Sequence, residues 1–193
     1  PKNFGEEFLA GVEGLGSAEG LLADKEARQR AIQAMVEGLQ ASPRFEVILS
    51  NINGKDYGTS IWDTQMDRWQ AIDLCIAVDC DGIVSLDAFD SDTSVTELIE
   101  VIDSADGNND AEEAIWYQLT RETNTVATWR FYDGFNGGVI DEKREHRVGS
   151  FLDASGATFE EALAGLPDGR SVVRGLAEQS ADDYVTRVAP RFE

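Results

Sequence analysis

The stretch that most constrains the fold runs from Arg68 to Asp92 and reads RWQAIDLCIAVDCDGIVSLDAFDSD. Apolar and polar residues alternate along both of its halves, and a period of two is typical of a half-buried β-strand. The Asp-Gly step between the halves is a strong turn signal. The stretch therefore predicts a β-hairpin with strands over residues 68–79 and 83–90.

The length of the turn decides which side chains share a face of this hairpin. A two-residue loop would mix apolar and acidic residues on each face, whereas a three-residue loop over 80–82 sets Val78 opposite Val84. Gly82 then occupies the left-handed position that such a loop requires, so we choose the three-residue loop. The predicted inward face is Ile72, Leu74, Ile76, Val78, Val84 and Leu86. The predicted outward face carries Asp73, Asp79, Asp87, Trp69 and Phe89.

The two cysteines of the chain, Cys75 and Cys80, lie in the same predicted hairpin. Five steps along a strand span about 16 Å, whereas a disulfide needs Cα atoms within about 7 Å. We therefore expect two free thiols. With no signal-peptide pattern and no apolar run of membrane-spanning length, free thiols predict a cytoplasmic protein.

The remaining segments complete an α+β pattern. Helical spacing of apolar residues predicts helices over 17–40, 93–105 and 111–123, and a Thr158–Glu161 capping box predicts one over 158–166. A short helix is expected around 180–188, and β-forming residues predict further strands over 44–52, 55–62 and 125–132. The expected fold is a single α+β domain over 1–193, an antiparallel sheet of about five strands with helices packed on one face.

No motif in the chain carries chemistry by itself, so no catalytic residue and no cofactor is predicted. The single histidine, His146, lies in a charged run, and one histidine with two cysteines is a poor zinc ligand set. Calcium-loop, phosphate-loop and nucleophile-elbow spacings are not met. A magnesium or calcium site built from Asp73, Asp87 and Asp90 is the one metal alternative that the sequence leaves open.

The charge is the strongest functional indication. The chain has 37 acidic residues against 16 basic ones and a formal net charge of −21. Nucleic acids and anionic membranes repel such a protein, whereas a basic protein partner is attracted to it. Solubility, or adaptation to a salty cytoplasm, explains the acidity equally well.

These indications favour a non-enzymatic binding protein that neutralises a basic partner, in character like bacterial immunity proteins and antitoxins, with a nuclease-type toxin as one such partner. The alternative is a hydrolase or metal-dependent enzyme with a salt-adapted surface. Tryptophan beside acidic residues is the composition of a binding hot spot. The predicted partner-binding residues are Asp73, Asp79, Asp87, Asp90, Asp92, Trp69 and Phe89.

Overall fold

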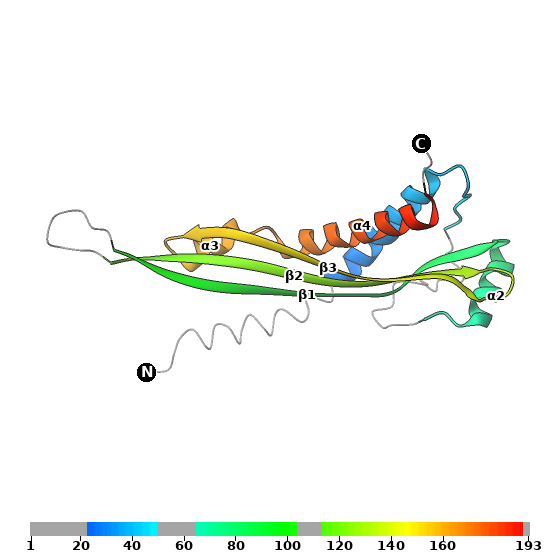
Figure 1. Ribbon diagram of the computed structural model, residues 1–193, viewed down its shortest axis with the longest axis horizontal. Helices are drawn as coiled ribbons and strands as arrows, with labels where there is room; N and C mark the ends of the chain where they lie inside the picture. The colour runs from blue at the N-terminus through cyan, green and yellow to red at the C-terminus, as the bar shows by residue number, and fades with distance from the viewer. Residues whose placement is uncertain (1–22, 50–64, 104–112, 191–193) are drawn as a thin grey trace.

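Three long antiparallel strands form the framework of the protein. The computed structural model describes residues 23–49, 65–103 and 113–190. Within them β1 (Gly82–Asp103), β2 (Glu113–Asp133) and β3 (Val139–Gly156) form one sheet in the order β1-β2-β3 (Figure 1). β1 has 22 residues, which corresponds to a length of about 70 Å. The sheet is therefore a long, narrow ribbon.

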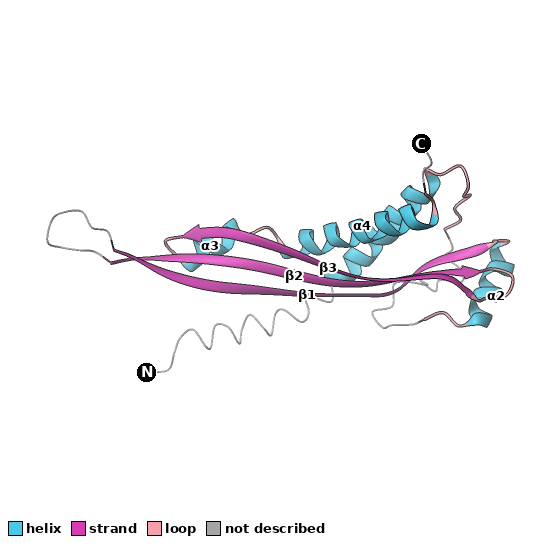
Figure 2. Cartoon of the chain, viewed as in Figure 1, coloured by secondary structure: helices cyan, strands magenta, loops and turns pink. Residues whose placement is uncertain are grey.

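Helices lie on this ribbon in two places (Figure 2). A helical segment over 23–40 and the last helix α4 (Gly169–Val188) pack on one face, and the short helix α3 (Phe159–Gly165) lies further along the ribbon. Helix α2 (Arg68–Val78) sits at the end of the ribbon where β1 begins. The predicted α+β architecture is confirmed, with three described strands instead of about five.

The main core lies between the helical segment 23–40, α4 and the sheet. The first helix contributes small and aliphatic side chains at intervals of four residues, namely Ala27, Ala31, Met35 and Leu39. The Trp129 ring of β2 stacks on the Tyr184 ring of α4, with ring centroids 5.8 Å apart. The Trp129 indole also donates a hydrogen bond to the Ser180 hydroxyl oxygen at 2.9 Å. This pairing ties α4 to the middle strand of the sheet.

Two predicted helices, over 93–105 and 111–123, are strands in the structure. Their described residues continue β1 and β2, with Thr93 opposite Thr123 and Val101 opposite Ile115. The first segment is rich in β-branched residues, and the second combines three of them with the aromatic Trp116 and Tyr117. Both residue types lose side-chain freedom in a helix and pack well on a pleated sheet. The apolar residues whose spacing predicts a helix over 93–105 are exposed, with 41%, 55% and 54% exposure for Val95, Leu98 and Ile99.

The predicted strand over 68–79 is also wrong, because residues 68–78 form helix α2. The Asp67 carboxylate accepts hydrogen bonds from the backbone N–H groups of Trp69 and Gln70, and the Gln70 side chain accepts one from the Asp67 N–H. This reciprocal cap starts a helix at a position where alternation alone favours a strand. As a result Ile76 is 74% exposed while Leu86 is 3% exposed, so the predicted shared apolar face does not form.

The helix brings the two cysteines together, and they form a disulfide. α2 ends at Asp79, which has a left-handed backbone conformation with φ 57°. That turn leaves the Cα atoms of Cys75 and Cys80 only 4.7 Å apart, within the range that a disulfide needs. The prediction of two free thiols is wrong, because it assumed an extended chain between them.

Several other predicted helices and strands are confirmed. The strands over 83–90 and 125–132 are confirmed within β1 and β2, and the helix over 17–40 is confirmed over 23–40. The helix over 158–166 is confirmed as α3, with the Thr158 hydroxyl accepting from the Glu161 N–H, and the last helix is longer than predicted.

The first two predicted strands fall at the limits of what the structure describes. Residues 44–49 of the strand predicted over 44–52 are not strand, and the strand over 55–62 lies outside the described residues. No helix in the described ranges combines the length and apolarity needed to cross a membrane.

Candidate binding surface

A buried polar cluster lies at the β-bulge of β1. The bulge falls between Leu86 and Ala88, so one extra residue, Asp87, is inserted opposite β2. The Asp87 carboxylate accepts a hydrogen bond from the Tyr132 hydroxyl at 2.7 Å and is paired with the Arg130 guanidinium. Arg130 also pairs with Glu142 of β3, at 2.6 Å. The cluster therefore links all three strands through side chains.

The electrostatics of this cluster indicate a structural role. Burial, and secondarily the hydrogen bond to Asp87, raise the pKa of Tyr132 to about 12. The hydrogen bond to Glu142 raises the pKa of Arg130, and Asp87 adds to this effect. Tyr132 therefore remains a hydrogen-bond donor and Arg130 a cation at neutral pH. Both groups hold the Asp87 carboxylate in place, and Asp87 as a whole is 7% exposed.

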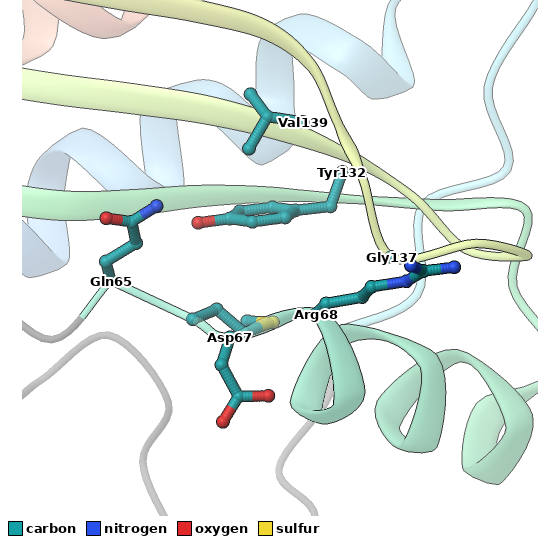
Figure 3. A pocket seen from close by; sticks show the side chains of 7 residues that line it. Gln65, Asp67, Arg68, Tyr132, Gly137 and Val139 are labelled. Carbon is teal, nitrogen blue, oxygen red and sulfur yellow. The ribbon is translucent and has the colours of Figure 1, made fainter.

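The Tyr132 ring also borders a shallow pocket of about 410 Å³. Figure 3 shows the ring lying between Val139 and the segment that carries Gln65 and Asp67, with the Asp67 side chain pointing away from the ring. Arg68 extends along Gly137 and donates a hydrogen bond from its Nε to the Asn136 carbonyl oxygen at 2.6 Å. This contact anchors α2 to the turn between β2 and β3.

The bulge also explains why Phe89 is a core residue. Without it, Leu86 and Ala88 would face the helices and Phe89 would face away. One inserted residue reverses the alternation beyond it. Phe89 therefore packs in the main core and is 6% exposed, which overturns its predicted place on an outward surface.

The structure does not gather the predicted partner-binding residues onto one surface. Helix α2 and its C-terminal end carry the exposed Trp69, Asp73 and Asp79. The two residues near the bulge, Asp87 and Phe89, are buried. The remaining two, Asp90 and Asp92, are exposed on β1. The predicted acidic face of a 68–90 hairpin is therefore wrong, and among the seven residues only Asp90 and Asp92 are exposed together on one strand.

The predicted magnesium or calcium alternative also fails on this placement. Asp73 lies on α2, Asp87 is held by Arg130 and Tyr132, and Asp90 is exposed on β1. Within residues 23–49, 65–103 and 113–190, no group of three or more His, Cys, Asp or Glu side chains could hold a metal ion.

A different acidic surface emerges along β1. The strand contains six acidic residues and no lysine, arginine or histidine. Four of these acids, Asp90, Asp92, Glu97 and Glu100, are exposed, and we call them the acidic edge. β1 pairs only with β2 among the described strands, so its other side is a sheet edge. Sequence reasoning missed the last two acids because it placed them on a helix.

Apolar side chains accompany the acidic edge. Val95, Leu98 and Ile99 of β1 and Ile115 of β2 are all exposed by more than two fifths. They lie in the part of the β1–β2 ribbon that extends beyond the main core (Figure 1). Exposed apolar residues grouped on one element indicate a contact surface more strongly than scattered ones do.

The opposite sheet edge has a different charge. β3 carries Lys143, Arg144, His146 and Arg147 among its acids. Arg147 pairs with Glu145 at 2.7 Å and also with Asp183 of α4, whereas Arg144 and His146 are exposed. Across the ribbon the charge of the strands therefore changes from purely acidic at β1 to mixed at β3.

A second cavity is a groove of about 840 Å³ with apolar and charged lining residues. It lies between the helical segment 23–40, residues 44–49, α2 and the start of β1. Its apolar walls include Met35, Leu39, Phe45, Leu74 and Leu86. Its size and partly apolar lining suit a binding groove in general, and charged residues of both signs, among them Arg44, Glu46 and Asp79, also line it.

The fold and the acidic edge define an α+β protein built on a three-stranded ribbon with helices on one face. Residues 2–193 match the family described as Domain of unknown function (DUF8603), and the chain belongs to that family. No curated protein matches the chain.

Proposed function

We propose that this protein is a non-enzymatic binding protein whose acidic edge captures and neutralises a basic protein partner. The observation that carries the proposal is the composition of β1, in which 22 residues include six acids and no base. Four of these acids are exposed on the side of the ribbon away from the mixed charges of β3. Such a one-signed surface attracts a basic protein and repels nucleic acid.

The mechanism follows from Coulomb attraction and desolvation. Carboxylates of the acidic edge would pair with lysine and arginine side chains of the partner, and the exposed apolar residues beside them would lose water on contact. Complementary fields raise association rates by roughly 10 to 1,000-fold at low salt. An immunity- or antitoxin-like role against a nuclease-type toxin fits this mechanism, because the cations so covered are those that would otherwise hold phosphates.

The cellular location of this role stays a prediction. Cytoplasmic location was expected from free thiols, and the Cys75–Cys80 disulfide removes that support. Disulfides persist in oxidising compartments, and in the cytosol they are rare. The alternative of a hydrolase or metal-dependent enzyme with a salt-adapted surface likewise stays a prediction.

The proposal is tested with two variants of equal net charge. The edge variant carries Asp90→Asn, Asp92→Asn, Glu97→Gln and Glu100→Gln. The control variant neutralises four exposed acids elsewhere, with Glu26→Gln, Glu46→Gln, Glu160→Gln and Asp182→Asn. The partner is isolated by co-purification from the native host at low salt, purified separately, and titrated against each protein.

We expect a basic partner whose affinity falls at least tenfold with the edge variant and less than twofold with the control variant. Affinity should also decrease as salt increases, because both surfaces are exposed. Equal losses in both variants would mean that bulk acidity, and not the edge, attracts the partner. A partner that is itself acidic would refute the proposal.

A further inference from the structure

The free edge of β1 offers more than charge. In an antiparallel sheet, every second residue of an edge strand directs its N–H and C=O away from its single neighbour. β1 pairs with β2 alone over nearly its whole length, from Gly82 to Asp103. Its outer side therefore presents a long row of backbone donors and acceptors that no other described strand satisfies.

Several of the devices that protect an edge strand are missing from the described residues of β1. Natural sheets block edges with charged side chains, especially lysine, with proline, with short strands or with bulges. The exposed acids of β1 are such charges, and they repel a strand of like charge. β1 has 22 residues, no proline, no lysine and one register shift, which lies near its start. Among the described residues, no strand lies beside the stretch from Ala88 to Asp103 on this side, so it offers a place for another extended chain.

Charge decides which chain can occupy this edge. A second copy would place one acidic strand beside another, so carboxylates would face carboxylates across the pair, which is destabilising. An extended segment with arginine or lysine at alternate positions would instead place cations beside Asp90, Asp92 and Glu100. These three share a face of β1, while Glu97 lies on the other, because side chains alternate along a strand.

We infer that the basic partner is held as an added β-strand along the free edge of β1. This inference rests on the proposed function and specifies how the partner binds. Backbone hydrogen bonds would supply the register. Basic side chains would contact Asp90, Asp92 and Glu100 on one face, and apolar side chains would contact the exposed Val95 and Ile99 on the other. The recognised chemistry is thus an extended peptide in which basic and apolar residues alternate.

The probe is a capped 12-residue peptide of alternating arginine and valine. Its matched control has the same sequence and charge, but its six central backbone amides are N-methylated, so that it cannot pair along either of its edges. Both peptides are titrated against the full chain and against the edge variant. Amide hydrogen exchange of residues 88–103 is followed with and without each peptide.

We expect the unmethylated peptide to bind at least tenfold more tightly than the methylated one. Its binding should slow exchange at least tenfold at every second amide of β1, the ones that exchange fast in the free protein. The edge variant should weaken binding of both peptides, because it removes the charge attraction without blocking the edge.

Other outcomes separate the inference from the proposed function. Equal binding of both peptides with unchanged β1 exchange would overturn strand addition, while the partner's loss with the edge variant would still support the acidic edge. If neither peptide binds, strand addition is likewise refuted. A concentration-dependent dimer with protected β1 amides in the absence of peptide would show that a second copy occupies the edge.

Discussion

Asp87 and Tyr132 are joined by a 2.7 Å hydrogen bond across the bulge of β1, with the Tyr132 hydroxyl as donor. The same carboxylate is paired with Arg130, so two β2 side chains depend on one β1 residue. Removing one partner of a buried ion pair is costly because the other charge stays buried. The Asp87 side chain is 4% exposed and that of Arg130 is 14% exposed.

We therefore expect Asp87→Ala to lower the free energy of unfolding by about 3 kcal/mol, as measured by urea denaturation. Asp90→Ala is the matched control, because Asp90 is exposed on the same strand; its effect should stay within about 0.5 kcal/mol. If Asp87→Ala lowered the free energy of unfolding as little as Asp90→Ala, the buried cluster would not stabilise the ribbon.

The hydrogen bond between Trp129 and Ser180 gives a second prediction. Ser180→Ala leaves the buried indole N–H without its acceptor, which should cost about 1–3 kcal/mol of unfolding free energy. In the Trp129→Phe background, which has no indole donor, the same change should cost less than half as much. Ser155→Ala, at an exposed position of β3, serves as the control. An unchanged cost in the Trp129→Phe background would contradict the coupling.

The disulfide gives a third prediction, concerning the end of α2. Closing so short a loop lowers the conformational entropy of the unfolded chain, which in the entropic account stabilises the folded protein by about 2 kcal/mol. Cys75→Ala/Cys80→Ala should therefore be less stable than the oxidised protein by about that amount. Reductant should lower the melting temperature of the natural protein and leave the double variant unchanged. Labelling of two thiols in the native, unreduced protein would contradict the disulfide itself.

A fourth prediction concerns pH and two carboxylates of opposite behaviour. Burial raises the pKa of Asp24, despite its hydrogen bond from Ser91, whereas the hydrogen bond from Arg187 lowers the pKa of Asp141. The Asp24 contribution to stability is fully present below the unfolded pKa of 3.8 and is lost as pH rises through the folded value. The Asp141 contribution is present above 3.8 and is lost as pH falls through its lower folded value.

Melting temperatures of two variants check these signs. Relative to the natural protein, Asp24→Asn should become more favourable as pH rises from about 3 to 7. Asp141→Asn should become less favourable over the same interval, because the natural carboxylate gains its ion pair with Arg187. Parallel pH profiles for the two variants would show that one of the two signs is wrong.

Part of the candidate surface was predictable. The sequence places six acids and no base in 82–103, whatever structure the segment adopts. Asp90 and Asp92 were predicted to contact a partner, and both are exposed on β1. Glu97 and Glu100 were missed because helical spacing of apolar residues was followed in a segment rich in β-branched side chains.

At residues 68–78 the sequence contains a signal for a helix start that competes with the alternation of apolar residues. Asp67 and Gln70 have the spacing of a capping box, which marks a helix start. Alternation of apolar residues favours a strand here, although short apolar runs fit a helix as well as a strand. The disulfide prediction failed for the same reason, since the Cys75–Cys80 distance depends on the conformation of the residues between them.

The sequence by itself determined the charge of the protein, the helix over 23–40 and the cap of α3, because charge needs no fold and strong local signals need no distant partner. Tertiary structure alone decided that β1 and β2 extend to 21 or more residues, that the bulge at Asp87 turns Phe89 inward, and that β1 is an edge among the described strands. Those features depend on which strand lies alongside and in what register, and the free energy of strand pairing is gained only when both strands are in place.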